Sequence, residues 1–534
     1  MYLLASLILL QLKGDVMSTK YDEVLQHWMD TSRPDATVSV SLHFKDTERI
    51  LSAFGADVNP YHTRHENARR LLSHLQDHAN AHQAPVLKYL NESTHLHGNR
   101  IRSLLLENKI AVQDASRELL LHLDSNLFNI KAIVHDELLP ADHPLHHIKS
   151  PATVASIESI KAWGRDFFFG EETYENWNIE RIQAPDVWKH GVEGAGVTVG
   201  IIDTGIRATH EKLGRHRITA WKDAVMGRSE PYDDAFHGTH VAGIIGATDG
   251  WGVAPKVDFV ICKAFGINQA TDSDLAECAE FMLCPDPNSG CSQTPSVINN
   301  SWVKESSYDI SFSPFIDAWH HVGIVTVFCT GNHFNPQTCA DLSIKPPALN
   351  HNQVISVGAT NEVNALASYS RQGIDANGRA TTTGRQPDLV APGSSIASTG
   401  HEEDDGRKTA SGTSMAAPHV TGTIALMQSV AANHDVILST NHIRILLQRS
   451  AIREGLQNPE FDCGSSPTFP NAAFGYGLLN TLEAVRSTRA YFGDDNEFFS
   501  DASRRMQTSR VVWGAVCVNW MWRQSQSQSS RRRR

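Results

Sequence analysis

The sequence predicts an α/β fold in which a doubly wound, mostly parallel sheet carries helices on both faces, preceded by a smaller α+β unit. Near-continuous apolar runs are typical of strands buried on both faces of such a sheet. They occur at residues 197–202, 257–265, 296–302, 324–330 and 353–359. Helix-like segments lie between several of these runs, at 273–283 and 313–321. Strands that alternate with helices favour parallel pairing, and ligands of such sheets bind at the carboxyl ends of the strands.

The chain before the first of these strands differs from the later part in its residue pattern and composition. Apolar residues recur at helical spacing over 67–90, where Pro85 is expected to interrupt the helix. A helix over 115–123 is then followed by a strand over 128–134, and 14 of the 27 histidines precede residue 148. Residues 140–151 predict a linker. At the other end, residues 489–534 predict a disordered tail that ends in four arginines.

Composition narrows the range of partners. The 534-residue chain is 41% hydrophobic, as globular proteins are, and its formal net charge of −12 argues against nucleic acid as a partner. No apolar stretch approaches the ~20 residues that span a bilayer. Residues 2–10 have the length of a signal-peptide core, but no basic residue precedes them and no cleavage site follows. A signal peptide over 1–16 and a true start at Met17 therefore both stay open.

The eight cysteines fit either redox compartment. Two groups are close enough in sequence to indicate disulfides in a secreted protein: Cys278 with Cys284 and Cys291, and Cys329 with Cys339. No Cys-x2-Cys pair exists, so the spacing does not indicate a zinc site. Cys262 lies inside an apolar run and is interpreted as a buried thiol of a strand. The sequence leaves the connectivity open.

Three short motifs supply an acid, a base and a nucleophile in the order Asp, His, Ser. Ser414 stands on a glycine-led turn before small residues that start a helix, where backbone N–H groups can stabilise an oxyanion. Asp203 ends the first strand run, in Asp-Thr-Gly, and His237 opens His-Gly-Thr-His-Val-Ala-Gly. A serine hydroxyl needs an adjacent base to become a nucleophile, so these three residues are expected to act together.

With these motifs, residues 177–485 resemble the subtilisin-like serine proteases, or subtilases. The run Asn-Asn-Ser-Trp at 299–302 and the lead-in at 178–188 look closest to the bacillopeptidase F-like branch. The resemblance implies a subtilisin-like catalytic domain over 173–488, preceded by a histidine-rich propeptide and linker over 17–172. It also implies a serine endopeptidase that hydrolyses peptide bonds in proteins through an acyl-enzyme intermediate and is made as a self-processing proenzyme.

The resemblance assigns roles to the matching positions. Ser414 would be the nucleophile, His237 the general base, and Asp203 the group that orients the imidazole. His240 would share a helical face with His237 and is the alternative base, although the family pattern gives that role to the first histidine. Asn332, in Thr-Gly-Asn, would be the second oxyanion donor; the alternative is a turn asparagine that satisfies its own backbone.

The family lays an extended substrate against an exposed strand edge. The matching substrate-binding residues are Ser301, Trp302, Val303, Thr330 and Gly331. A glycine usually stands at the position of Val303, so large side chains three or four residues before the scissile bond are expected to be disfavoured. Residues 346–348, Pro-Pro-Ala, match a segment that shapes a wall of the pocket next to the scissile bond, and a cis bond is expected there.

No cofactor is expected to be required, although the family often holds structural calcium. The acidic pairs at 233–234 and 404–405 are candidates, with solvated loops as the alternative, and no metal site is assigned. Expected partners are protein or peptide substrates and the chain's own propeptide as intramolecular inhibitor, which acid should loosen if some of its histidines are buried and neutral. We expect a monomer outside the cell or in the secretory pathway. A cytosolic processing peptidase and a catalytically silent binder on the same fold are the alternatives.

Overall fold

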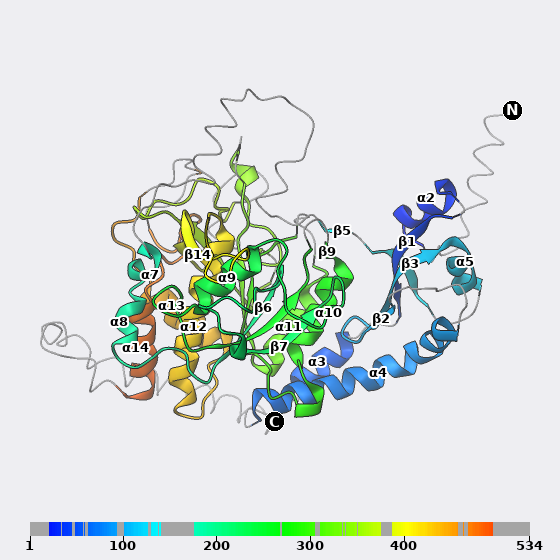
Figure 1. Ribbon diagram of the computed structural model, residues 1–534, viewed down its shortest axis with the longest axis horizontal. Helices are drawn as coiled ribbons and strands as arrows, with labels where there is room; N and C mark the ends of the chain where they lie inside the picture. Colours follow the sequence, from blue (N-terminus) through cyan, green and yellow to red (C-terminus); the bar gives the residue numbers. More distant parts are fainter. Residues whose placement is uncertain are drawn as a thin grey trace, which may run out of the picture.

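The computed structural model describes residues 21–139, with gaps at 34, 45–47, 57, 59–61, 93–100, 126–129 and 137. It also describes residues 176–494, with gaps at 267–269, 305–309, 334, 337, 350, 375–386, 458–462 and 464–467. The proposed signal segment, most of the predicted linker and nearly all of the predicted tail lie outside these residues. Figure 1 shows a smaller N-terminal unit, drawn blue to cyan, beside a larger body drawn green to red.

The N-terminal unit, residues 21–139, is an α+β structure with a four-stranded antiparallel sheet in the order β2-β3-β1-β4. Its strands are β1 (Thr37–His43), β2 (Ile101–Leu104), β3 (Lys109–Ser116) and β4 (Ala132–His135). Its helices are α2 (Glu23–Thr31), α3 (Glu48–Ala56), α4 (Arg64–Glu92) and α5 (Arg117–Ser125). The predicted helices over 67–90 and 115–123 and the predicted strand over 128–134 correspond to α4, α5 and β4, whereas the other helices and strands of the unit were not predicted. The expected interruption at Pro85 is wrong, because α4 continues through that residue to Glu92.

The larger body is built on a seven-stranded sheet in the order β13-β12-β11-β10-β6-β8-β7. All neighbouring strands in it are parallel. Five of the strands match the predicted runs: β6 (Thr198–Asp203), β8 (Asp258–Lys263), β10 (Val297–Asn300), β11 (Val325–Cys329) and β12 (Val354–Thr360). The edge strands β7 (Ile218–Asp223) and β13 (Leu389–Pro392) were not predicted. The predicted parallel α/β fold is therefore confirmed.

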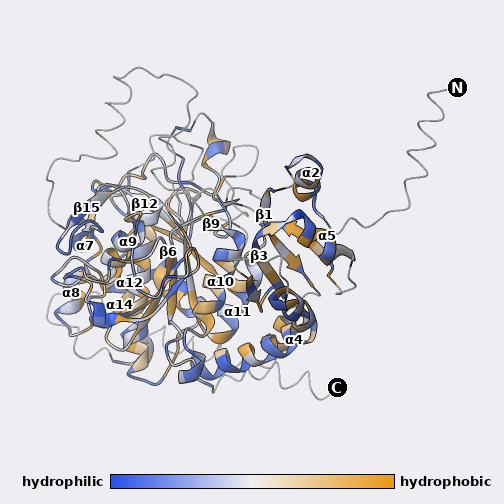
Figure 2. Ribbon diagram, turned by 45° about the vertical axis from the view of Figure 1, so that its right-hand side comes forward, coloured by the Kyte–Doolittle hydropathy of each residue, from blue (hydrophilic) through white to orange (hydrophobic). Residues whose placement is uncertain are grey.

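Helices cover both faces of this sheet (Figure 2), and alternate strand residues point to each face. Ile201 belongs to one core with residues of α9 (His237–Gly246), α12 (Thr413–Ala432) and α14 (Thr481–Phe492). Its neighbour Ile202 belongs to a second core with residues of α10 (Asp272–Leu283) and α11 (Ser313–Val322). The central helix α12 is buried almost throughout, which fixes the position of the residues at its first turn.

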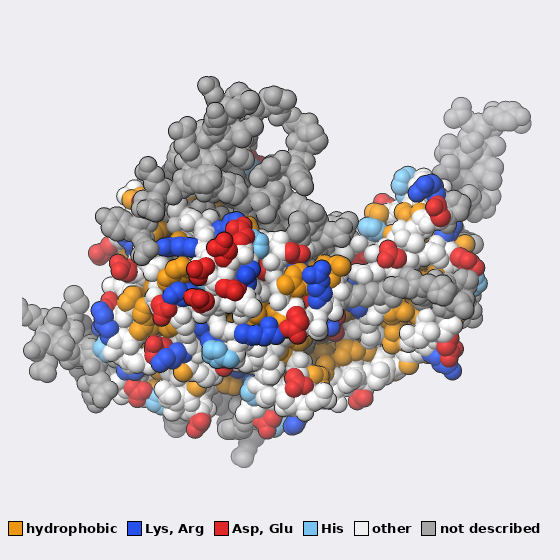
Figure 3. All heavy atoms as spheres, viewed as in Figure 1, with side chains coloured by type: hydrophobic (Ala, Val, Ile, Leu, Met, Phe, Trp, Pro, Cys, Tyr) orange, Lys and Arg blue, Asp and Glu red, His pale blue; other side chains and the backbone are white. Residues whose placement is uncertain are grey.

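Shorter elements complete the larger body. The helices are α7 (Trp177–Arg181), α8 (Ala184–Trp188) and α13 (Thr440–Ser450). The 3₁₀ turns are η2 (Arg215–Arg217), η3 (Pro287–Ser289) and η4 (Cys339–Leu342), and an outer hairpin pairs β14 (Ile396–Thr399) with β15 (Arg407–Ala410). Among the described helices, none has the length and hydropathy needed to cross a bilayer. On the face shown in Figure 3, acidic and basic side chains are interspersed rather than gathered by sign.

The N-terminal unit docks on the face of the sheet that α10 and α11 cover. Leu51, Phe54, Leu71 and Leu75 of α3 and α4 share an apolar core with residues of those two helices. Arg102 in β2 donates to Asp274 (2.5 Å) and forms an ion pair with Glu277 (3.1 Å), both on α10. In addition, β5 (Leu138–Leu139) pairs antiparallel with β9 (Ala270–Thr271), immediately before α10 begins. Apolar, ionic and main-chain contacts therefore all hold the unit in place.

The disulfides differ from the sequence-based expectation. Cys262 is not a free thiol, because its side chain points from β8 toward α10 and bonds to Cys278 there. Cys284 pairs with Cys291, as their closeness suggested. The expected link between Cys329 and Cys339 is wrong. Cys329 lies buried in the core at the end of β11, where its thiol donates to the Trp302 carbonyl oxygen, and Cys339 pairs with Cys463, 124 residues further on.

Candidate active site

Asp203 and His237 meet at the carboxyl end of the central strands. Asp203 is the last residue of β6, and His237 is the first of α9. His237 Nδ1 lies 2.8 Å from Asp203 Oδ1, and each side chain is 2% exposed. An ionised carboxylate only accepts hydrogen bonds, so Nδ1 carries the proton and Nε2 is left as the accepting nitrogen. The pair therefore has the geometry of an oriented general base.

A buried hydrogen-bond network fixes the turn after Asp203 against the start of α9. Asp233 accepts from Thr204 Oγ1 (2.9 Å) through one oxygen and from the Thr239 amide (2.9 Å) through the other. Gly238 N donates to Thr204 Oγ1 at 2.8 Å. A side chain at Gly238 would place its Cβ 2.2 Å from the Gly205 carbonyl oxygen, so only glycine allows this close approach. The residues that neighbour Asp203 and His237 in the two motifs therefore hold the two segments together.

Lys263 also contacts the turn that follows Asp203. It ends β8 beside Asp203 on β6, and its side chain is fully buried. Its ammonium donates to the carbonyl oxygens of Thr204 (2.6 Å) and Phe265 (2.8 Å) and to Asp234 Oδ1 (2.6 Å). This role could not be predicted from the sequence, because the lysine lies in an apolar run far from the motifs.

The second histidine of the motif is placed for a different task. His240 Nε2 lies 3.0 Å from the carbonyl oxygens of both Ile396 and Lys408, so this nitrogen carries its proton. Burial lowers the pKa of His240 to about 3, which keeps the ring neutral near neutral pH. A ring fixed to two carbonyl oxygens and sealed in the core packs α9 against the β14–β15 hairpin. This geometry favours His237 over His240 as the base.

Ser414 lies in the first turn of α12, where the amides have no acceptor within the helix. Its hydroxyl donates to the Ser301 carbonyl oxygen at 3.1 Å, and the Ser301 hydroxyl donates to the Ser414 carbonyl oxygen at 2.8 Å. This reciprocal pair joins the end of β10 to the start of α12. Ser414 is 5% exposed in the full chain.

Asn332 faces the same turn from the loop that follows β11. Its Oδ1 accepts from the Thr413 amide (2.9 Å) and from Thr413 Oγ1 (3.0 Å). Because an amide N–H can only donate, this contact fixes which end of the carboxamide is oxygen. Nδ2 lies on the side of Ser414, because a Cβ on Gly412 would be 3.5 Å from Nδ2 and 3.6 Å from Ser414 N. A donor is therefore presented beside Ser414, unlike in a turn asparagine that satisfies its own backbone.

The predicted substrate-binding residues line two neighbouring segments. Ser301 contacts Ser414 directly, as described above. The Trp302 indole packs against Phe312 and Phe328, with ring centroids 5.0 Å apart in each case, so only its backbone is available to a substrate. Val303 lies against the other segment: a Cβ on Gly331 would be 3.3 Å from Val303 Cγ1. The expected cis bond is present, between Pro346 and Pro347.

Three carboxylates of the two acidic pairs are engaged by other protein groups. Both carboxylate oxygens of Asp233 are engaged by Thr204 and Thr239, and Asp234 pairs with Lys263. Asp404 Oδ1 accepts from Arg207 at 2.8 Å. Within the described residues no group of three or more His, Cys, Asp or Glu side chains is arranged to hold a metal ion.

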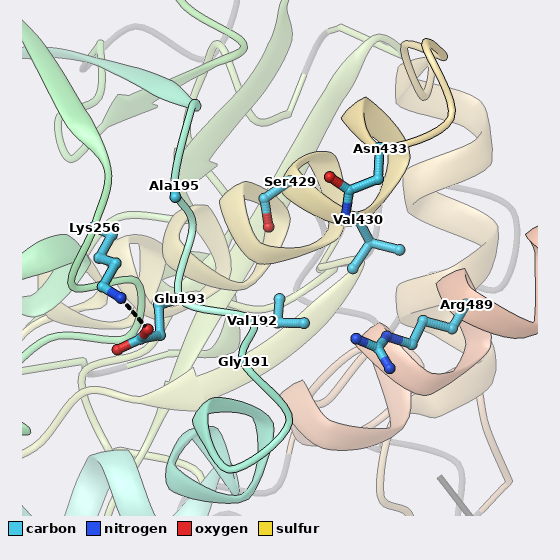
Figure 4. A pocket seen from close by; sticks show the side chains of 9 residues that line it. All are labelled: Gly191, Val192, Glu193, Ala195, Lys256, Ser429, Val430, Asn433 and Arg489. Atoms are coloured by element: carbon cyan, nitrogen blue, oxygen red, sulfur yellow. Dashed lines mark ion pairs between the residues drawn. The ribbon is translucent and has the colours of Figure 1, made fainter. Parts of the chain in front are cut away.

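A hollow of about 490 Å³ lies away from these residues (Figure 4). It is lined by Gly191, Val192, Glu193, Ala195, Lys256, Ser429, Val430, Asn433 and Arg489. Lys256 and Glu193 form an ion pair of 2.5 Å on one side of it. None of the predicted site residues lines this hollow.

An acid, an imidazole and a serine hydroxyl at the carboxyl ends of a parallel sheet define the class of α/β serine hydrolases. Comparison with known families narrows this class: the model described as "Subtilase family" matches residues 194–477. The match covers more than half of the chain, and the protein belongs to the subtilase family of serine proteases.

Individual relatives agree with this assignment. Bacillopeptidase F of Bacillus subtilis (strain 168) is 30% identical over 450 residues, which is 79% of this chain and 29% of that protein. The minor extracellular protease Epr of the same strain is 31% identical over 326 residues, 60% of this chain and 43% of Epr. Subtilisin BL of Lederbergia lenta is 30% identical over 315 residues, 58% of this chain and 98% of that protein. This chain thus spans under half the length of the first two, and its likeness to the first extends beyond residues 194–477.

Proposed function

We propose that the protein is a serine endopeptidase in which Ser414 is the nucleophile, His237 the general base and Asp203 the group that orients the imidazole. The observation that supports this most is the 2.8 Å bond between His237 Nδ1 and Asp203 Oδ1, which leaves Nε2 to accept a proton. In this mechanism His237 takes the proton of Ser414 as the hydroxyl attacks the substrate carbonyl, and returns it to the leaving amine. Water then hydrolyses the acyl-enzyme.

Two donors would stabilise the oxyanion of the tetrahedral intermediate. One is the Ser414 amide in the first turn of α12, and the other is Asn332 Nδ2, held outward by Thr413. Both are in place before substrate binds, so little reorganisation is needed when negative charge develops. The substrate backbone would pair with residues 301–303 on one side.

A fluorophosphonate probe tests the proposal directly. If the mechanism holds, the probe modifies Ser414 and no other serine, and peptide mapping by mass spectrometry places the adduct on that residue. A folded chain that takes no label would instead support a silent binder on this fold.

We further propose that the N-terminal unit is a propeptide that inhibits the site until it is removed. The support comes from β5, the last described strand of the unit, which pairs with β9 on the edge of the larger body. The chain between β5 and α7 lies outside the described residues, so the cleavage site, proposed between about residues 148 and 178, rests on the sequence alone.

We also propose that the protein is secreted. Three disulfides form among the described cysteines, and disulfides persist in oxidising compartments. Electrophoresis with and without reductant checks this proposal, because a cytosolic peptidase would run identically in both.

Docking of the N-terminal unit is expected to depend on pH in two opposite ways. Glu280 on α10 accepts from the Leu106 amide at 2.7 Å, and burial raises the pKa of Glu280 to about 8. A free glutamate titrates near ~4.3, so docking takes up a proton between these values and weakens as the pH rises toward 8. On α11, the His321 ring lies against Gly55, whose added Cβ would be 2.3 Å from His321 Cε1. Burial lowers the pKa of His321, so docking also weakens as the pH falls below ~6.5.

Other groups at this contact act with these two. Burial likewise lowers the pKa of His65 on α4, which favours docking above ~6.5. Asp317 on α11 opposes the shift of His321. Near Glu280, Lys109 and Glu107 form an ion pair of 2.7 Å.

We therefore expect the affinity of the isolated N-terminal unit for the mature domain to peak between about pH 6 and 7. Glu280→Gln should flatten the alkaline arm only, and His321→Gln the acid arm only. Because neither side chain is fully closed to solvent, each arm should fall well short of the ~tenfold per pH unit that one proton allows. Inhibition constants measured from pH 5 to 8.5 decide this, and a flat profile for the native pair would contradict it.

Val303 should restrict the substrate side chain nearest the scissile bond. The valine lies against Gly331, next to the proposed oxyanion donor, which supports a place nearer to the scissile bond than the three or four residues expected from the sequence. Val303→Gly is expected to favour large over small side chains at that substrate position by about ten- to two-hundredfold in relative kcat/KM. Cleavage of a peptide library by both proteins measures the shift. Identical profiles would remove Val303 from the binding site.

A further inference from the structure

The segment 369–371 runs beside the loop that presents Asn332. His333 N donates to the Tyr369 carbonyl oxygen at 2.9 Å, and Arg371 N donates to the Gly331 carbonyl oxygen at 3.3 Å. Asn332 and Ser370 form an antiparallel bridge between these contacts. The backbone on both sides of Asn332 is therefore held by a segment that belongs to none of the predicted motifs.

The Arg371 side chain extends behind this loop and is only 7% exposed. Nε donates to the Asn332 carbonyl oxygen at 3.2 Å. Nη1 donates to the carbonyl oxygens of Asp341 (2.6 Å) and Ser343 (3.0 Å). A planar guanidinium with donors in a fixed fork holds three carbonyl groups in one arrangement, which a lysine ammonium on a flexible stem cannot do.

The packing around the arginine stem leaves little freedom. Gly331 has φ +90°, and an added Cβ there would lie 3.0 Å from Arg371 Cδ. The guanidinium thus contacts the loop from one side while Thr413 holds the Asn332 carboxamide from the other.

We propose that Arg371 is a positioning residue for the oxyanion donor, anchoring the backbone of Asn332 so that Nδ2 points at the developing charge. This inference rests on the proposed function. Displacement of a catalytic group by about 1 Å costs on the order of 10² in rate, so loss of the anchor is expected to slow the reaction without removing any group that touches substrate.

Arg217 provides a matched control for the general effect of losing a buried arginine. It is also 7% exposed, and it donates to the carbonyl oxygens of Val257 and Gly246, both at 2.8 Å. It is the last residue of η2, immediately before the edge strand β7, away from Asn332. Its loss should lower stability without changing the geometry of the oxyanion donor.

The test is a double-mutant cycle read out as the second-order rate constant for labelling of Ser414 by a fluorophosphonate. The variants are compared at the same state of processing, which electrophoresis records, because the N-terminal unit is proposed to inhibit the site until it is removed. Arg371→Met, Arg371→Lys and Arg217→Met are each made in the native and the Asn332→Ala background. We expect Arg371→Met to slow labelling about ten- to hundredfold in the native background and less than about threefold when Asn332 is absent. Arg371→Lys should behave like Arg371→Met, whereas Arg217→Met should lower the melting temperature and leave labelling within about twofold in both backgrounds.

Equal slowing by Arg371→Met with and without Asn332 would overturn the proposal, as would full activity of Arg371→Lys. If the methionine variant does not fold, the lysine variant carries the same cycle. Failure of the proposed function is distinguishable, because the native chain would then not react with the probe at all.

Discussion

Replacing Ser414 with alanine should abolish peptide hydrolysis and self-processing together. The hydroxyl is the only atom group lost, and the helix turn that holds it is fixed by Thr413, Asn332 and Ser301. Where nucleophile, base and acid act as one unit, loss of the nucleophile costs about 10⁶ in kcat. The full-length chain should therefore accumulate uncleaved. Electrophoresis of the purified variant and a peptide-hydrolysis assay measure the two losses separately.

Ser411→Ala is the matched control. Ser411 lies three residues upstream and is also buried, but its hydroxyl accepts from the Ser395 amide. This variant is expected to process itself and to retain most of its activity. If Ser414→Ala still hydrolysed peptides at more than a trace level while remaining folded, another residue would have to be the nucleophile.

The sequence was sufficient for the parallel sheet because its five inner strands are buried on both faces and read as apolar runs. The edge strands were missed for physical reasons. In β7, Ile-Thr-Ala-Trp-Lys-Asp is half-buried and mixes polar with apolar residues, and β13 has only four residues and ends in proline. Pro85 was misjudged because the tertiary packing of α4 outweighs the local cost of a proline inside a helix.

The candidate site was predictable where function depends on short contiguous motifs. Asp203, His237, Ser414 and Asn332 each stand in such a motif, and the fold brings them to one end of the sheet. The residues that hold them in place were not predictable. Lys263 and Arg371 donate to backbone carbonyl oxygens of segments distant in sequence. Because every residue has a backbone carbonyl group, the residue type does not indicate which one accepts. The disulfide of Cys262 was not predicted either, because its formation depends on which side of β8 faces α10.

The N-terminal unit shows that composition can miss residues on which a prediction depends. The abundance of histidine before residue 148 predicts a contact that loosens in acid. In the structure, the ring of His321, which belongs to α11 of the larger body, lies against Gly55 of the unit. The histidine count covers only the chain before residue 148, whereas residues of both the N-terminal unit and the larger body form the contact between them.

Replacing Asn332 with alanine should lower kcat by about 10²–10³ and leave KM nearly unchanged. The Nδ2 donor acts on negative charge that exists only after the nucleophile has attacked, so ground-state binding does not depend on it. Alanine also leaves the Thr413 amide without its acceptor, which adds a cost in stability.

Asn332→Asp separates the two effects, because a carboxylate still accepts from Thr413 but offers no donor. We expect this variant to keep its melting temperature and to lose at least as much kcat as the alanine variant, since its charge repels the oxyanion. Thr413→Val, which keeps the backbone amide bond to Oδ1, should cost far less. Steady-state kinetics on one peptide substrate, with thermal unfolding of each variant, measures all three. A rise in KM at constant kcat for Asn332→Ala would place this side chain in substrate binding and leave the Ser414 amide without its proposed partner.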